Sequence, residues 1–182
     1  MDLEKALIEH YQTAWGNISH SLVWSKGPQK DLPKEFRVLS FSKDSTTSVL
    51  ATCGLSFGSA ENKIELFLYC PENILEENRL CEILTVTAHY HLTGGNLGVG
   101  HSVNWGEPII NGSLCNWGYL SWPYLEGESF GDVQLSSTKI LWLVPITKQE
   151  LEYKKKNGVD ALEIVFEEQG LNYISFFRQS MV

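Results

Sequence analysis

Three histidines are the first residues to weigh for chemistry, because neutral imidazole binds zinc and three histidines can hold a catalytic ion. They are His89, His91 and His101. Residues two apart on a helix point in roughly opposite directions, so His89 and His91 can face one ion only if the helix has already ended. No tetrahedral ligand set is visible at this spacing. We therefore expect no metal and no cofactor, with one histidine at a helix end and another in a hydrogen-bonded turn.

A cysteine nucleophile assisted by His101 is the second enzymatic alternative. Cys115 lies in an Asn-Trp-Gly context, and Cys53 precedes a glycine. Spacing identifies no orienting carboxylate for either, and a catalytic triad is recognised by geometry rather than by sequence position. Carboxylates are plentiful, but none is paired in a recognisable glycosidase or metal motif. A hydrolase is therefore kept only as a competing hypothesis, and we expect no catalytic residue.

Glycines cluster at Gly94, Gly95, Gly98 and Gly100, as they do in loops that bind phosphate. Here they follow an expected helix instead of a strand, and no G-K-[ST] sequence comes after them. The pattern predicts an irregular connection and no nucleotide site.

Aromatic and acidic residues are interleaved between positions 105 and 132, and residues 123–133 are typical of an exposed acidic loop. Aromatic side chains within a polar rim are the usual centre of a protein interface. For Trp117 and Trp122 we favour the alternative that they cover the sheet, since large aromatics contribute heavily to cores. Acidic side chains in the loop would attract a basic partner. The candidate partner-binding residues are Trp105, Glu107, Tyr124, Glu126, Glu128, Phe130 and Asp132.

The stretch from Lys139 to Gly170 predicts a strand followed by two helices. Ile140 to Val144 is a continuous apolar run, and Pro145 ends it. Such a run suits an internal strand that is covered on both faces.

Capping residues define the two helices. Thr147 and Glu150 form a T-x-x-E capping box, which starts the first helix. Lysines crowd its last turn, and Asn157-Gly158 tolerates the left-handed conformation at a helix end. Asp160 can cap the second helix, whose apolar face is formed by Leu162, Val165 and Phe166.

Apolar periodicity and turn residues predict the other elements. Helices are expected over residues 2–15, with Asp2 as the cap, and over 74–91. Gly54 interrupts one of the expected strands, where glycine commonly marks a bulge or a close backbone approach. Three successive strands, 36–41, 46–55 and 64–70, predict a meander. The remaining strands are expected over 18–24, 101–105, 114–122 and 171–177.

Length and charge bound the class of protein. The 182 residues, of which 43% are apolar, fit one compact domain over residues 1–182. A net charge of −8 argues against nucleic acid or anionic lipid as the main partner and favours a basic protein, although it also maintains solubility. No apolar run approaches the roughly 20 residues of a membrane span, and the N-terminus does not resemble a signal peptide. We expect a cytoplasmic protein whose four cysteines are small buried side chains.

Four segments together resemble the Suppressor-of-fused (SUFU) domain family. T-C-G-L-S at 52–56 is similar to the family's T-x-G-M-S, and E-L-F-L-Y-C-P at 65–71 to its E-L-x-x-x-L-P. G-V-G-H-S-V-N-W-G-E-P at 98–108 is similar to G-x-G-H-T-x-x-x-G-x-P. The stretch from Lys139 to Gly170 looks like the family's C-terminal part. It contains, in order, a strand, P-I-T-x-x-E-L-E, a lysine-rich turn, N-G and an A-L-E helix. The motif positions, which we expect to be structural, are Gly54, Ser56, Pro71, Gly100, His101, Pro108, Pro145, Glu150 and Gly158.

The resemblance implies an α+β fold in which a mixed, mainly antiparallel central β-sheet is flanked by α-helices. It also implies a non-enzymatic, protein-binding domain. Bacterial members of the family are thought to include immunity proteins, each of which neutralises a co-encoded toxin, often a nuclease. We therefore expect a bacterial single-domain member that binds a basic toxin domain. The alternative is a general sequestering module that binds an extended peptide along an exposed strand edge.

Overall fold

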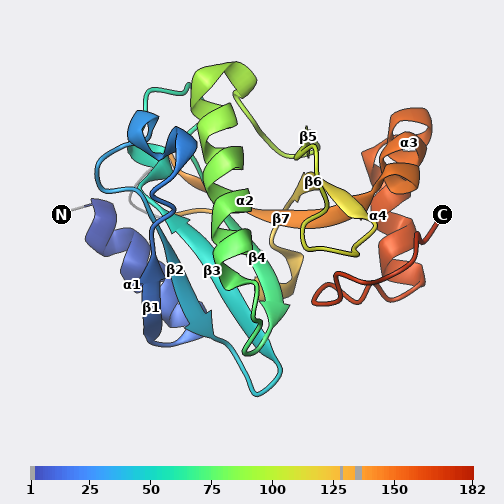
Figure 1. Ribbon diagram of the computed structural model, residues 1–182, viewed down its shortest axis with the longest axis horizontal. Coiled ribbons are helices and arrows are strands. Elements are labelled where there is room, and N and C mark those ends of the chain that lie inside the picture. Colours follow the sequence, from blue (N-terminus) through green and yellow to red (C-terminus); the bar gives the residue numbers. More distant parts are fainter. Residues whose placement is uncertain (1–2, 128, 134–136) are drawn as a thin grey trace.

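A central sheet runs through the molecule and carries helices on its faces (Figure 1). The structure is a computed structural model that describes residues 3–127, 129–133 and 137–182. Within these residues, seven strands form one sheet in the spatial order β1-β2-β3-β4-β7-β6-β5. The strands are β1 (Ile18–Leu22), β2 (Arg37–Ser42), β3 (Thr47–Cys53), β4 (Ile64–Pro71), β5 (Ser102–Asn104), β6 (Cys115–Ser121) and β7 (Lys139–Thr147).

Strand directions give the sheet its mixed character. Neighbouring strands are antiparallel except β4 and β7, which run parallel from the pair Ile64 and Lys139. Between β4 and β7 the chain passes through a long helix and through β5 and β6. Parallel neighbours require such a crossover connection. The expected mixed, mainly antiparallel α+β sheet is confirmed.

Alternating side chains explain why β2, β3 and β4 form the predicted meander. In β2, Val38 packs on one face of the sheet while Leu39 and Phe41 pack on the other. The same alternation places Leu66 on the first face and Phe67 on the second. Each strand therefore contributes to two cores. Because both faces of these internal strands are covered, both faces carry apolar side chains.

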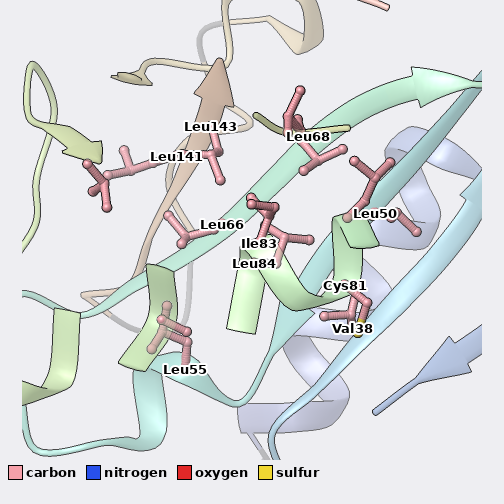
Figure 2. Packing of buried hydrophobic residues seen from close by; sticks show 14 of the residues in the cluster. Val38, Leu50, Leu55, Leu66, Leu68, Cys81, Ile83, Leu84, Leu141 and Leu143 are labelled. Carbon is pink, nitrogen blue, oxygen red and sulfur yellow. The ribbon is translucent and has the colours of Figure 1, made fainter. Parts of the chain in front are cut away.

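The first core lies between the sheet and the long helix α2 (Glu77–Tyr90), which crosses the front of the sheet in Figure 1. The helix buries residues at helical spacing, including Leu80 and Leu84. Figure 2 shows Ile83 and Leu84 of α2 with Leu66 and Leu68 of β4 in this cluster. Side chains of β6 and β7 complete the core.

The second core lies on the opposite face, beneath α1 (Leu3–Trp15), α3 (Lys148–Asn157) and α4 (Val159–Glu168). It is rich in aromatic rings, and those of Tyr11 and Trp15 stack with their centroids 5.1 Å apart. Helices α3 and α4 lie near the C-terminal end of the chain, far from α1 (Figure 1). This arrangement leaves the sheet between them to be covered by loops. None of the described helices is long and apolar enough to cross a bilayer.

The predicted capping box at the start of α3 is confirmed. The Glu150 amide donates to Oγ1 of Thr147 across 3.2 Å, and the Thr147 amide donates to Oε2 of Glu150 across 2.8 Å. Glu150 is fully buried, and Arg178 donates across 2.8 Å both to its Oε2 and to the carbonyl of Pro145. This ion pair ties the C-terminal segment to β7 and α3.

The expectation that Pro145 ends its strand is wrong, because β7 continues through Pro145 to Thr147. Proline cannot donate to a sheet ladder and is tolerated where a strand has a free side. The pairing of β4 with β7 stops at Trp142, so one side of β7 has no β4 partner from there onward. Pro145 lies opposite Gly118 on the other side.

Three further local expectations are wrong. Residues 171–177 form no strand, because the Phe176 side chain enters the first core and its carbonyl accepts a hydrogen bond from Ser113. Asp160 does not cap α4, since the helix begins at Val159 with Gly158 at the N-cap position. Gly54 follows β3 instead of interrupting it, although the close backbone approach expected at this glycine is confirmed, since a Cβ there would lie 3.1 Å from the Cα of Phe36. The predicted cap Asp2 lies outside the described residues.

Candidate functional site

The expected exposed loop at 123–133 is partly internal. Phe130 is only 5% exposed, and its ring centroid lies 4.9 Å from that of Trp15. The ring also packs against Phe67 of β4 and stacks on His10 of α1. The expectation of an exposed loop is therefore wrong for Phe130, because this ring fills the space between α1 and the sheet.

The Glu126 carboxylate is also turned inward. Its side chain is 6% exposed and contacts the Lys43 ammonium and the Tyr69 hydroxyl. Burial and the neighbouring Glu126 carboxylate raise the pKa of Tyr69, so this phenol remains a hydrogen-bond donor. The expectation of an exposed acidic loop is wrong for Glu126 as well, because its charge is satisfied within the chain.

The other predicted residues contact several different elements. Trp105 is half-buried and donates from Nε1 to Oγ1 of Thr87 in α2 across 3.1 Å, whereas Tyr124 is 59% exposed and contacts α4. Glu107 is 78% exposed and lies 3.6 Å from Arg79. Asp132 is 61% exposed and contacts Lys139. Their role in partner binding stays a prediction, and Glu128 lies outside the described residues.

Trp117 and Trp122, for which we favoured a covering role, differ from each other. Trp117 is partly buried and packs against the second core. Trp122 is 36% exposed, and the Lys139 ammonium lies 5.8 Å from its ring centroid.

A groove of about 640 Å³ lies beside α4, where the helix meets β6, β7 and the turn at 124–126. Its apolar floor includes Trp142 and Val144 of β7 and Phe166 of α4. Leu125 and Ile164, each about half exposed, form part of its rim. We call this feature the α4 groove. Its lining residues are Tyr119, Ser121, Tyr124, Leu125, Trp142, Val144, Asp160, Glu163, Ile164, Phe166, Glu167, Gly170, Leu171 and Tyr173.

Glu163 is the polar centre of the α4 groove. Its Oε1 accepts hydrogen bonds from the Tyr119 hydroxyl across 2.6 Å and from the Ser121 hydroxyl across 2.7 Å. Its Oε2 accepts one from the Tyr124 hydroxyl across 3.1 Å. These donors come from β6 and from the turn that follows it, so the carboxylate is held in a defined position between sheet and helix.

The acidic face of α4 was not among the predicted site residues. Asp160, Glu163, Ile164 and Glu167 follow the i, i+3, i+4, i+7 spacing of one helix face, and all line the groove. Leu162, on another face, is fully buried. Helical periodicity in the sequence contains this signal, but the prediction for this helix used it only to find the buried face.

The titratable groups argue against nucleophilic chemistry at the described cysteines. All four are buried and unpaired, and burial raises the pKa of Cys53 and Cys70 to about 12 and that of Cys81 to about 11. Burial likewise raises the pKa of Cys115. Since the thiolate is the nucleophilic form, the geometry provides no activated cysteine among them.

The histidines do not converge on an ion site. Buried His91 accepts a hydrogen bond from the Leu97 amide at Nδ1 across 2.9 Å, and its Nε2 lies 3.0 Å from the Asn62 carbonyl. His89 faces Asp31 at 3.4 Å, and His101 is exposed. Within the described part of the chain, no group of three His, Cys, Asp or Glu side chains is arranged to hold a metal.

Comparison with known proteins decides the family. A family model described as Suppressor of fused protein (SUFU) matches residues 33–179. The chain belongs to the SUFU family. A search of curated proteins gives no match.

Solved SUFU structures share the fold. A SUFU homolog from Neisseria gonorrhoeae FA 1090 is 24% identical in sequence to this chain. The match covers 100% of this chain and 98% of the homolog, and the two structures superimpose with a TM-score of 0.84. A chain in the Sufu-Fu complex structure is 14% identical in sequence and superimposes with a TM-score of 0.69. That match covers 97% of this chain and 91% of the other. Drosophila Suppressor of Fused is 13% identical with a TM-score of 0.73, and this chain spans 54% of its length. At these identities the likeness is one of fold.

The first SUFU motif positions surround a buried carboxylate. Glu65 is fully buried and accepts hydrogen bonds from the Thr52 and Ser56 hydroxyls and from three amides, those of residues 54–56. Burial raises its pKa to about 6, although these hydrogen bonds oppose the shift. Gly54 has φ +103°, and a Cβ there would lie 3.1 Å from the Cα of Phe36. Only glycine fits this turn without strain.

The later motif positions also make internal contacts. The Gly100 amide donates to the Leu120 carbonyl across 2.8 Å, and the Leu120 amide donates to the His101 carbonyl across 2.9 Å. The Gly100 carbonyl in turn accepts from Lys154 of α3. Gly158, with φ +98°, joins α3 to α4. Pro71 is the last residue of β4, and the Pro108 carbonyl accepts from Arg79 across 3.1 Å.

Proposed function

We propose that this chain is a protein-binding domain that binds and neutralises a basic toxin domain, such as a nuclease. Membership of the SUFU family supports a protein-binding role, and one of the structurally similar proteins is the Sufu-Fu complex. The toxin as partner is the more specific part of the proposal, and it rests on charge and on the family resemblance.

The observation that carries the proposal is the apolar α4 groove with a rim of carboxylates. Apolar side chains at its rim are exposed, among them Leu125 and Ile164, each at 50% or more. An apolar surface surrounded by polar groups is the usual anatomy of a protein interface. Because Asp160, Glu163 and Glu167 line the groove of a chain with net charge −8, the favoured partner is basic.

Charge also supplies a means of neutralisation. A nuclease must attract phosphate, so the surface around its active cleft carries lysines and arginines. An acidic inhibitor associates quickly with such a surface and competes with nucleic acid for it. Neutralisation then requires no bond to be made or broken by the inhibitor.

Co-expression with the toxin domain encoded by the adjacent gene tests this function. The wild-type chain should restore growth, and the triple variant Asp160→Asn, Glu163→Gln, Glu167→Gln should restore it much less. A double variant of exposed carboxylates outside the groove, Glu152→Gln with Glu168→Gln, is the matched control and should rescue like the wild type. Growth arrest in the presence of abundant, folded wild-type chain would contradict the toxin role.

A sequestering module that binds an extended peptide at a strand edge is the second candidate. The observation in its favour is that β1 and β5 are the outer strands of the sheet, each paired on one side. Added strands bind mainly through backbone hydrogen bonds, so loss of charge in the α4 groove would leave this mode of binding intact. The triple variant described above therefore separates the two candidates.

A further inference from the structure

Among the described residues, three hydroxyls donate to the Glu163 carboxylate, which lines the α4 groove. A carboxylate offers about four lone-pair positions, and hydrogen bonds from three hydroxyls account for three of them. Oε1 accepts two of these bonds, whereas Oε2 accepts only the one from Tyr124. Oε2 can therefore accept one more donor from a molecule in the groove.

In the part of the chain that the structure describes, the carboxylates of the groove also lack a cation. Two buried acids near the sheet, Glu126 and Glu150, are paired with Lys43 and Arg178 respectively. Among the ion pairs that the described residues form, none involves Asp160, Glu163 or Glu167. The three negative charges at the groove are thus available to an external cation.

Apolar and aromatic surfaces surround this charge. Trp142 and Phe166 form the floor and are each less than 10% exposed, so the chain itself leaves little room for solvent beneath them. Tyr124 is 59% exposed, and its ring stands beside the Glu163 carboxylate that its hydroxyl contacts. A planar cation that binds Glu163 can pack against this ring, and its apolar neighbours can cover the floor.

The size of the groove calls for more than one side chain. Its volume of about 640 Å³ lies in the range of about 300–1,000 Å³ that is typical of sites for small molecules. One arginine side chain fills only part of this space. A short segment fits the groove better. Its cation can bind the carboxylates, and apolar residues next to the cation can contact the floor and the exposed rim.

We infer that the α4 groove recognises an arginine side chain flanked by bulky apolar residues in an extended segment of the partner. The guanidinium donates to Oε2 of Glu163, and the flanking residues contact Trp142, Phe166 and Ile164. Arginine suits this position better than lysine because its planar, weakly hydrated group combines donation to a carboxylate with packing on an aromatic ring. The inference rests on the proposed protein-binding function and specifies the chemistry of the bound segment.

Fluorescence anisotropy with a labelled peptide, fluorescein-Gly-Leu-Arg-Leu-Gly-amide, tests this recognition. The control peptide carries citrulline in place of arginine, which keeps the shape and removes the charge. The wild-type chain should bind the arginine peptide at least about tenfold more tightly than the citrulline peptide, because a charged hydrogen-bonding partner is lost. Glu163→Gln should reduce this discrimination to near unity.

Two further variants keep the test decisive. Glu168→Gln removes an exposed carboxylate on the same helix outside the groove and should bind like the wild type. Ile164→Arg changes a 52% exposed rim residue, so it should fold. Its guanidinium lies within reach of Asp160 and Glu167, four residues before and three after it on α4, and the added positive charge at the rim should abolish binding of the arginine peptide. Circular dichroism checks the fold of every variant.

The outcomes separate the two proposals. Equal binding of both peptides, no detectable binding, or equal losses in Glu163→Gln and Glu168→Gln would overturn arginine recognition. Failed toxin rescue with selective peptide binding would overturn only the toxin role. Toxin rescue that Ile164→Arg leaves unchanged would overturn recognition of the partner through the groove.

Discussion

The Tyr119 hydroxyl donates a hydrogen bond to Oε1 of Glu163 across 2.6 Å, and this contact joins β6 to α4 across the wall of the groove. Tyr119 is only 1% exposed, and its ring is part of the second core. Its hydroxyl, in contrast, donates to a carboxylate that lines the groove. Burial and the hydrogen bond with Glu163 raise the pKa of Tyr119, so the phenol stays protonated and remains a donor. The position of the groove's central carboxylate is thus set by the packing of the core.

Tyr119→Phe should lower the free energy of unfolding by about 1 kcal/mol, because it removes one buried hydrogen bond. It should also weaken binding of the arginine peptide, since Glu163 loses one of the three hydroxyl donors that fix its position. Tyr153→Phe on α3 is the matched control and should change stability by less than about 0.5 kcal/mol. Urea unfolding of the three proteins measures the difference, and equal losses in the two variants would contradict the assigned role.

Lys43→Met should destabilise the turn that forms one wall of the α4 groove. It leaves the 6% exposed Glu126 without its cation, and we expect a loss of about 1–3 kcal/mol, because Lys43 is itself 25% exposed and its charge is partly screened. Lys139→Met breaks the more exposed pair with Asp132 and should cost less than about 1 kcal/mol. Thermal unfolding compares the two variants, and the reverse order would refute the stabilising role of Lys43.

Arg178→Met should be the most destabilising of the charge substitutions. The Glu150 side chain is fully buried, and loss of a buried partner costs about 3–5 kcal/mol. Protease sensitivity should appear first at residues 171–182, because Arg178 also holds this segment to the Pro145 carbonyl. Lys155→Met, which breaks an exposed pair with Glu152, is the control. A stability loss no larger than that of the control would contradict the role of this pair.

Mild acid should destabilise the fold through His91. Its Nδ1 accepts from the Leu97 amide, which requires the neutral ring, and burial lowers its pKa below the usual 6.5. A base whose pKa is lower in the folded state contributes stability above its unfolded pKa, and this contribution is lost as the pH falls below about 6.5. The melting temperature of the wild type should therefore fall more steeply between pH 7 and pH 5 than that of His91→Gln. Parallel pH profiles would show that His91 does not titrate in this way.

Local patterns predicted most of the fold because local physics decides it. Alternation in β2 separates Val38 from Leu39, and the Thr147–Glu150 capping box starts α3 where expected. Failures occurred where tertiary packing decided the outcome. Pro145 stays in β7 because the β4 pairing has already ended, and the β-rich residues 171–177 form no strand because Phe176 packs in the first core.

The site was harder to predict because exposure depends on distant contacts. Glu126 looked available to a partner, but Lys43 and Tyr69 occupy its carboxylate. Phe130 looked exposed, but the rings of α1 bury it. Glu163 is the opposite case, since its three donors lie on β6 and the following turn, and no spacing within α4 shows that they meet it.

Hydrogen–deuterium exchange of the chain, measured with and without the toxin domain encoded by the adjacent gene, is the most direct test of binding at the α4 groove. We predict that the partner slows exchange in α4 (Val159–Glu168) and in residues 119–125, and that Ile164→Arg removes this protection. Protection confined to the outer strands β1 or β5, with α4 unchanged, would contradict binding at the groove.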